Sequence, residues 1–347
     1  MALAIRLGKY PYTYLRTLIM KRNLLSKSDY DKILKMSPEE IGKYLEEFEY
    51  KKEVDELAME YRGVELIERT LQKSLGNKFG KLLRISPQDL KLLIKVYQKR
   101  YDIYNIKVIL RAKFSSIPQN EIRSHMSPVA VEKNDFFEKL IAQKTVEEAI
   151  SALSFLDESR LRAALDHFRN NNSLVYIENA LDRHYFLSVI SQLTYLSTEG
   201  KVYRKFLLNE MDIINVKMLL RSKHENLGEQ SIREMIVGFG SIKKSAVDRM
   251  TKSDISGIMK ELESTQFREI FEKYKDFDRI NFTDLELSLD KFLLEQSRKL
   301  VRQNPMTVDA ILGYMFLKDI EVKNLTRIIK AKQLGLSEEF IGKTILI

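Results

Sequence analysis

DIYNIKVILRAK at residues 102–113 recurs as DIINVKMLLRSK at residues 212–223 and, with more changes, as EVKNLTRIIKAK at residues 321–332. The central asparagines are Asn105, Asn215 and Asn324, which lie 110 and then 109 residues apart. This period is well above the roughly 20–50 residues of a solenoid repeat. The chain is therefore predicted to contain three copies of one domain-sized module.

Two further patterns keep the same order in all three copies. IERTLQK at residues 67–73 matches IENALDR at 177–183 and LELSLDK at 285–291, and an isoleucine follows each central asparagine by 17 residues. Loop-like sequence occurs at SHMSPVAVEK and VGFGSIKKS, after residues 123 and 236. We therefore place the modules at residues 1–127, 128–236 and 237–347.

The composition favours helices throughout. Hydrophobic residues make up 44% of the chain and charged residues 31%, with only 13 glycines and 6 prolines. No segment alternates polar and apolar residues as a strand would. We predict an all-α fold with five or six helices per module.

Capping boxes mark several expected helix starts. Ser37, Thr145 and Thr251 are each followed three residues later by an acidic residue, a pattern that satisfies free backbone N–H groups at a helix start. Ser86 and Asp89 form the same pattern before a long helix that runs from Leu90 through Asn105.

The repeated polar residues fall on a largely apolar helix face. Asp102, Ile106, Ile109 and Lys113 are spaced i, i+4, i+7 and i+11, with Asn105 alongside. Buried polar groups need partners, and we expect the preceding helix of each module to supply its glutamate; a ligand site is the alternative. The repeated signature comprises Glu68, Asp102, Asn105 and Arg111, then Glu178, Asp212, Asn215 and Arg221, then Glu286, Glu321, Asn324 and Lys330.

The sequence offers no catalytic constellation. It has no cysteine, which excludes disulfides and thiolate metal sites, and its four histidines lack metal-ligand spacing: His125, His167, His184 and His224. We expect those histidines at the surface or half-buried. GNKFGKLL from Gly76 and GFGSIKKS from Gly238 do not fit a phosphate-binding loop, so helix ends or turns are expected there. We predict no catalytic residue, no cofactor and no metal.

The net charge of +9 is spread among interspersed acidic and basic residues. No apolar run approaches the ~18 residues of a membrane span, and Arg6 and Lys9 interrupt the start where a signal peptide would be apolar. A cytoplasmic protein is expected.

The signature at residues 101–113 and 210–223, its changed copy at 321–332 and the closing GLSEEFI at 335–341 resemble the C subunit of the archaeal-type (A/V-type) ATP synthase, the counterpart of the d subunit of the eukaryotic vacuolar proton pump. The third copy departs from the pattern, with Glu321 in place of aspartate and Lys330 in place of arginine. The similarity extends over essentially the whole chain.

This resemblance implies a funnel of three helical modules about a pseudo-threefold axis. Such a subunit is a non-catalytic central-stalk rotor adaptor that binds the membrane proteolipid ring and the central shaft subunits, binds no nucleotide, and transmits torque for proton- or sodium-driven ATP synthesis or hydrolysis. It would lie on the cytoplasmic side of the cell membrane, peripheral and without a transmembrane segment, and the isolated chain would be monomeric.

Two other functions fit a basic helical protein. One is nucleic-acid binding, suggested by the basic, aromatic stretch KVYQKRYDIYNIK at residues 95–107. Against it, no helix concentrates basic residues on one face, so no nucleic acid is expected as a partner. The other is a generic helical scaffold with unrelated partners.

Overall fold

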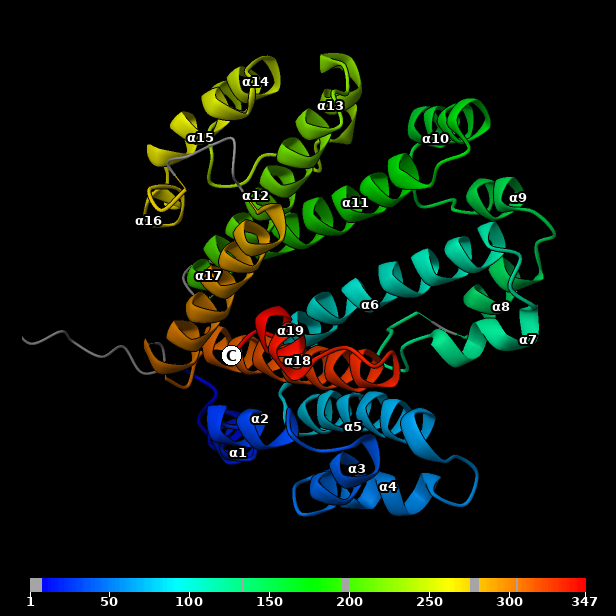
Figure 1. Cartoon of the computed structure of the whole chain (residues 1–347), viewed down its shortest axis with the longest axis vertical. Helices are drawn as coiled ribbons and strands as arrows, with labels where there is room; N and C mark the ends of the chain where they lie inside the picture. Colours follow the sequence, from blue (N-terminus) through cyan, green and yellow to red (C-terminus); the bar gives the residue numbers. More distant parts are fainter. Residues whose placement is uncertain (1–7, 133, 195–199, 275–280, 304) are drawn as a thin grey trace, which may run out of the picture. The chain divides into compact units, whose positions relative to one another are not determined.

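The structure is a computed structural model that describes residues 8–132, 134–194, 200–274, 281–303 and 305–347 (Figure 1). These residues form α-helices and one 3-10 helix, and they contain no strand, which confirms the all-α prediction. In the first predicted module the helices are α1 (Pro11–Arg22), α2 (Lys27–Ile33), α3 (Pro38–Glu46), α4 (Lys51–Leu57), α5 (Gly63–Ile85), α6 (Gln88–Phe114), α7 (Gln119–Ile122) and the 3-10 helix η1 (Arg123–His125). The second contains α8 (Asn134–Ala142), α9 (Val146–Ser151), α10 (Glu158–Asn171), α11 (Val175–Thr194), α12 (Lys201–His224) and α13 (Glu229–Met235). The third contains α14 (Lys244–Lys252), α15 (Ile255–Glu263), α16 (Arg268–Phe271), α17 (Phe282–Gln303), α18 (Val308–Gln333) and α19 (Glu338–Thr344).

The helices follow one order three times. In each copy three shorter helices are followed by a pair of long ones, α5 with α6, α11 with α12 and α17 with α18, and then by a short helix, so that α2–α7, α8–α13 and α14–α19 correspond. The described residues thus contain six α-helices in the second and third modules, as predicted. The first module has seven, because α1 precedes the repeated order and has no counterpart.

The chain divides into two compact units. One consists of Met1–Ile94, Thr198–Tyr203 and Asp290–Ile347, and in it α18 packs along α5 and α1 around buried side chains such as Phe79 and Tyr314. The other consists of Lys95–Ser197 and Arg204–Leu289, where α10 packs on α9 and α11, and α14 packs on α13 and α15. Both units contain parts of more than one repeat, so the boundaries at residues 127 and 236 stay a prediction.

Two of the predicted capping boxes are present. The hydroxyl of Ser37 accepts from the backbone N–H of Glu40, whose carboxylate accepts in return, and Thr145 and Glu148 pair in the same way. The prediction for Thr251 is wrong. Thr251 lies in the last turn of α14, and α15 begins four residues later, at Ile255, because the carboxylate of Asp254 is itself the cap.

The predicted box before α6 is also wrong. The hydroxyl of Ser86 donates to the carbonyl of Leu82 at the end of α5, and Asp89 accepts instead from the hydroxyl of Tyr10 and pairs with Lys9. The hydroxyl of Ser86 thus caps the end of α5, and the carboxylate of Asp89 is held by Tyr10 and Lys9 rather than by the backbone of Ser86.

The two glycine-bearing segments differ from each other. GFGSIKKS begins in a loop before α14, as predicted, whereas GNKFGKLL lies in the middle of α5 rather than at a helix end. Gly238 and Gly240 do not have positive φ, contrary to the expectation of a cap. They are glycines because of close approach: a Cβ on Gly240 would lie 2.2 Å from Oδ1 of Asp212 and 2.3 Å from the carbonyl oxygen of Leu208.

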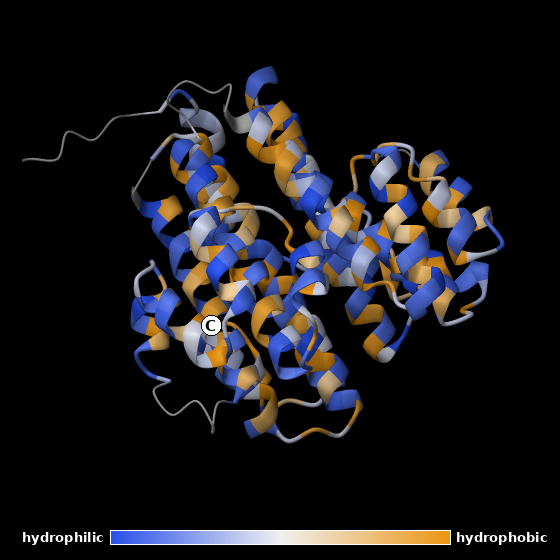
Figure 2. Ribbon diagram, turned by 90° about the horizontal axis from the view of Figure 1, so that it is seen from above, coloured by the Kyte–Doolittle hydropathy of each residue, from blue (hydrophilic) through white to orange (hydrophobic). Residues whose placement is uncertain are grey.

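Each helix carries apolar and polar residues side by side, as Figure 2 shows by hydropathy. The apolar positions face the cores of the two units, and in the part of the chain that the structure describes no helix is both long and apolar enough to cross a membrane.

We expect Gly240→Ala to lower the unfolding free energy by about 2–3 kcal/mol, because the added methyl group meets a carbonyl and a carboxylate that cannot both move. Urea denaturation measures this. Gly228→Ala is the control, since a Cβ there meets nothing within 4 Å. Equal losses in the two variants would contradict the close-approach explanation.

Candidate functional site

Each second long helix carries one buried asparagine that holds the end of its own module. The Asn105 amide donates to the carbonyl of Ser127 at 3.0 Å and accepts from its N–H at 2.7 Å. Asn215 does the same with Gly238 and Val237, at 2.8 and 2.9 Å, and Asn324 with Leu346, at 2.6 and 3.0 Å. We call the segments so held, residues 126–132, 236–243 and 345–347, the return segments.

This finding corrects the expected partners. The repeated glutamates Glu68, Glu178 and Glu286 were predicted to satisfy the buried asparagine and acid of their own module, and they do not. The asparagines pair with backbone, because a primary amide matches one peptide N–H and one peptide carbonyl.

The repeated acids bind the chain that leads into the next module. Asp102 accepts from the N–H groups of Val131 and Glu132 at 2.7 and 3.0 Å. Asp212 accepts from Ser241 and Ile242 at 2.6 and 3.0 Å. In the third copy, Glu321 accepts from the N–H of Leu25, just before α2, at 2.6 Å.

The repeated cations pair with the repeated glutamate of the next module. Arg111 forms a bidentate pair with Glu178 at 2.6 and 2.7 Å, and Arg221 forms one with Glu286. Lys330 of the third copy lies 3.2 Å from Glu68 of the first. The order of pairing is therefore cyclic: first to second, second to third, and third to first.

One repeated contact was missed by the sequence analysis. The ammonium of Lys113 donates to the carbonyl of Ile141 at the end of α8, Lys223 to that of Thr251 at the end of α14, and Lys332 to that of Leu34 after α2. A cation at free helix-end carbonyls is favourable. The signal was present, since this lysine is identical in all three copies.

We call each set of contacts from one module to the next a junction. The first joins Asp102, Arg111 and Lys113 to residues 131–178, the second joins Asp212, Arg221 and Lys223 to residues 241–286, and the third joins Glu321, Lys330 and Lys332 to residues 25–68. Because the same three positions act each time, the repeated signature specifies contacts between modules.

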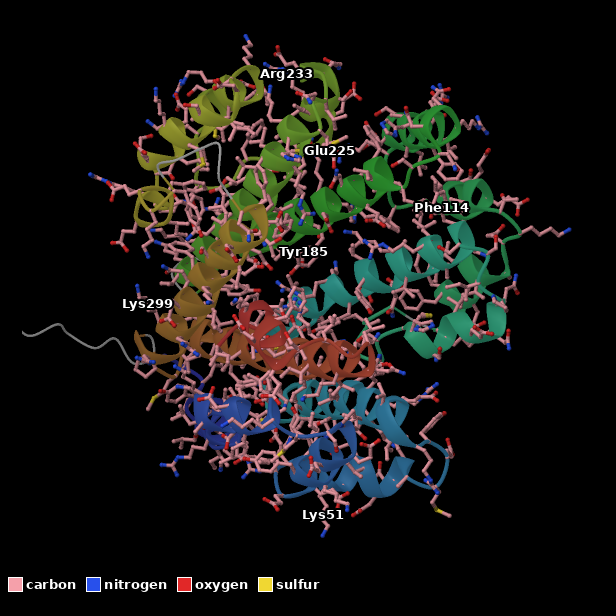
Figure 3. All side chains as sticks on the ribbon, viewed as in Figure 1. Lys51, Phe114, Tyr185, Glu225, Arg233 and Lys299 are labelled. Carbon is pink, nitrogen blue, oxygen red and sulfur yellow. The ribbon has the colours of Figure 1, made fainter. Side chains whose placement is uncertain are left out.

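A second missed contact joins equivalent positions of the first two copies. The guanidinium of Arg100 pairs with Glu210 at 3.2 Å and donates to the hydroxyl of Tyr185 on α11, labelled in Figure 3. It also lies 4.1 Å from the ring centre of Tyr97, within cation–π range. The sequence could not single it out, because the two copies carry opposite charges there.

The third junction has a buried charge network that the others lack. The ammonium of Lys318 is fully buried and lies 2.6 Å from Glu49, 2.7 Å from Glu321 and 2.8 Å from the hydroxyl of Tyr50. Tyr50 also donates to Glu321 at 2.6 Å. The change from aspartate to glutamate at position 321 thus has a physical reason, since the longer side chain reaches these donors as well as the N–H of Leu25.

The electrostatics of the acids differ between junctions. Burial raises the pKa of Asp102, and it raises that of Asp212 from 3.8 to about 6 despite hydrogen bonds from Ile242 and Ser241. Burial alone would lower the pKa of Lys318, but Glu321 and Glu49 outweigh it and raise that pKa. Lys318 therefore stays charged within its network.

The histidines lie as predicted. His125 and His224 are exposed, and His167 and His184 are half-buried. Within the described ranges no group of histidine, aspartate and glutamate side chains is arranged to hold a metal ion. The geometry of the repeated residues suits mechanical connection between modules.

We expect Asn215→Ala to lower the unfolding free energy by about 3 kcal/mol, because the N–H of Val237 and the carbonyl of Gly238 lose their partner while buried. Asn171→Ala is the control: its amide bonds to the carbonyl of His167 at an exposed helix end, and its loss should cost under about 0.5 kcal/mol. Similar losses in the two variants would refute the role of Asn215 in holding its return segment.

The raised pKa of Asp212 predicts a pH dependence of stability. The folded state holds this proton more tightly than the unfolded state, so its contribution to stability is full below pH ~4 and falls as the pH rises to ~6. The unfolding free energy of the native chain relative to Asp212→Asn should therefore fall by up to about 3 kcal/mol between pH 4 and pH 7.

Asp157→Asn is the control of opposite sign. Ser159 and the N–H of Arg160 lower the pKa of Asp157, so the native chain should gain stability relative to this variant as the pH rises. Denaturant unfolding at several pH values measures both variants, and a native-minus-Asp212→Asn difference that does not change with pH would contradict the assignment.

Comparison with known proteins identifies the family of this chain. The family model of the ATP synthase (C/AC39) subunit matches residues 16–344. The chain is 32% identical to the C subunit of the A-type ATP synthase of Methanosarcina mazei, over 98% of this chain and 93% of that protein. It is 28% identical to the corresponding protein of Methanocaldococcus jannaschii, over 99% and 88%, and 27% identical to that of Haloferax volcanii, over 97% of each. A match of this extent places the chain in the C/AC39 subunit family of ATP synthases.

Proposed function

We propose that this protein is the central-stalk adaptor of a rotary A/V-type ATP synthase, which binds the membrane proteolipid ring and the central shaft and transmits torque between them. Family membership makes the chain a subunit of an ATP synthase, part of a membrane-bound complex and structural rather than catalytic. The adaptor role, the two partners and a peripheral position on the cytoplasmic side are the finer proposal.

The observation that carries the proposal is the cyclic order of the junctions. An adaptor that turns with a ring has to accept a shaft near its rotation axis, and three like modules about a pseudo-threefold axis leave such a place. Contacts running from the first module to the second, to the third and back to the first are those that this arrangement would produce. The module boundaries at residues 127 and 236 belong to the same proposal.

Torque transmission also requires stiffness within each module. The buried asparagine amides hold the return segments, and the repeated aspartates hold the start of the next module. Both contacts are direct hydrogen bonds to the backbone. Packed helical interiors have low compressibility, so a twist applied at one end is passed on rather than absorbed.

The excess of basic over acidic residues favours acidic partners. The net charge of +9 favours association with acidic shaft residues or with anionic headgroups around the ring, and such steering weakens as salt screens it.

The test is size-exclusion co-elution of the purified chain, separately, with the detergent-solubilised proteolipid ring and with the shaft subunits of the same organism. We expect a stable complex with each, and weaker complexes at 1 M than at 0.1 M salt, where the Debye length shortens from about 10 to about 3 Å. The chain alone should elute as a monomer, which serves as the folding control.

Failure to bind both partners while the chain elutes as a folded monomer would overturn the adaptor role. Binding that does not change with salt would remove the charge argument and leave the adaptor role in place. A strongly salt-dependent affinity for DNA or RNA, with no ring or shaft complex, would favour the nucleic-acid hypothesis instead.

A further inference from the structure

A basic cavity of about 210 Å³ lies in the unit that contains both chain ends, between the end of α1, the start of α2 and the last turns of α17. Four cationic side chains line it: Lys21, Lys27, Arg298 and Arg302. Its walls are completed by apolar residues such as Leu24 and Leu317. Lys27 and Arg302 are exposed, so the cavity can be reached from solvent.

Basic side chains outnumber acidic side chains in the lining of this cavity by four to one. Burial lowers the pKa of Lys21, and the nearby Arg302 and Arg298 lower it further, so these three cations are close enough to repel one another. Arg298 pairs with Glu295. Within the described residues, neither Lys21 nor Arg302 forms an ion pair with a carboxylate.

Among the side chains lining the cavity, the only carboxylate belongs to Glu321, and it is already committed. One of its oxygens accepts from the N–H of Leu25, and the other accepts from Tyr50 and lies 2.7 Å from the buried ammonium of Lys318. The charge of Glu321 is therefore neutralised by the buried Lys318. It does not neutralise the four cations that line the cavity.

Two of these cations have no counterpart in the other modules. Lys21 belongs to α1, the helix without a counterpart in the other modules. Arg298 follows Glu286 by twelve residues, and the equivalent positions after Glu68 and Glu178 hold Gly80 and Ile190. A structural need shared by the three modules therefore does not explain Lys21 or Arg298, whereas Arg302, sixteen residues after Glu286, corresponds to Arg84 of the first module.

We propose that this cavity is a binding site for a phosphate group. Two arginines and two lysines match the geometry and charge of phosphate oxygens, and the arginines can each present two parallel donors. The cavity is large enough for one phosphate-bearing group and its first substituent. The phosphate can belong to an anionic lipid headgroup or to a soluble polyphosphate, and the proposal stands apart from the adaptor role.

The test uses the full chain and two probes. Pyrophosphate binding is measured by isothermal titration calorimetry, and lipid binding by co-sedimentation with phosphatidylcholine vesicles containing or lacking 30% phosphatidylglycerol. The variant is Lys21→Gln with Arg302→Gln. Lys51→Gln with Lys299→Gln is the control; it removes the same charge from exposed positions outside the cavity, labelled in Figure 3.

We expect saturable binding of at least one probe, weakened at least tenfold in the cavity variant and less than twofold in the control. Binding of pyrophosphate without vesicles identifies a soluble ligand, and binding only to phosphatidylglycerol vesicles identifies a headgroup. The cavity variant should keep or raise the melting temperature, because it relieves repulsion.

Absence of binding to both probes by the native chain would overturn the proposal. So would equal loss of binding in the two double variants, since this would reduce the effect to net charge. A fall in melting temperature confined to the cavity variant would show that the cations serve the fold instead.

Discussion

The buried amide of each central asparagine is the constraint on which the rest of the structure depends. By pairing with one peptide N–H and one peptide carbonyl at a fixed distance along the chain, Asn105, Asn215 and Asn324 each set where a return segment lies. In the first two copies that segment then offers backbone N–H groups to the repeated aspartate and leads into the first helix of the next module. One local hydrogen-bond pair thus fixes both the end of a module and the start of its neighbour.

The free-energy contributions of the contacts show which of them hold a junction together and which add little stability. The arginines of the Arg111–Glu178 and Arg221–Glu286 pairs are more than 60% exposed, and such pairs contribute at most about 1 kcal/mol each. A buried amide or acid whose partner is lost costs about 1–3 kcal/mol for each unsatisfied group. The buried Asn and Asp contacts therefore set the register, and the outer ion pairs, together with the lysines on helix ends, restrict how adjacent modules slide.

The fold could be predicted from the sequence because repetition and helical periodicity are properties of one chain read in order. The partners of Glu68, Glu178 and Glu286 could not. In a chain of equal repeats, a contact within a copy and the equivalent contact to the next copy carry the same sequence signal, so Glu178 fits Asn215 as well as it fits Arg111. The prediction of a helix cap at Thr251 was wrong for a local reason, because Asp254 caps that helix start instead. The sequence could not reveal the role of Lys318. A lysine also stands at the equivalent position 99, where it lacks the buried network.

The third junction shows how a repeated contact can be altered without being lost. An isolated lysine at the depth of Lys318 would be neutral or would not be tolerated, since burying an ion costs several kcal/mol. Here Glu49 and Glu321 supply opposite charge, Lys78 pairs with the far oxygen of Glu49, and the network is neutral as a whole. Removing any one member leaves an uncompensated buried charge, worth about 3–5 kcal/mol, which exceeds the cost of breaking an outer ion pair several times over. The junction that departs most from the repeated pattern is therefore the one least able to tolerate substitution.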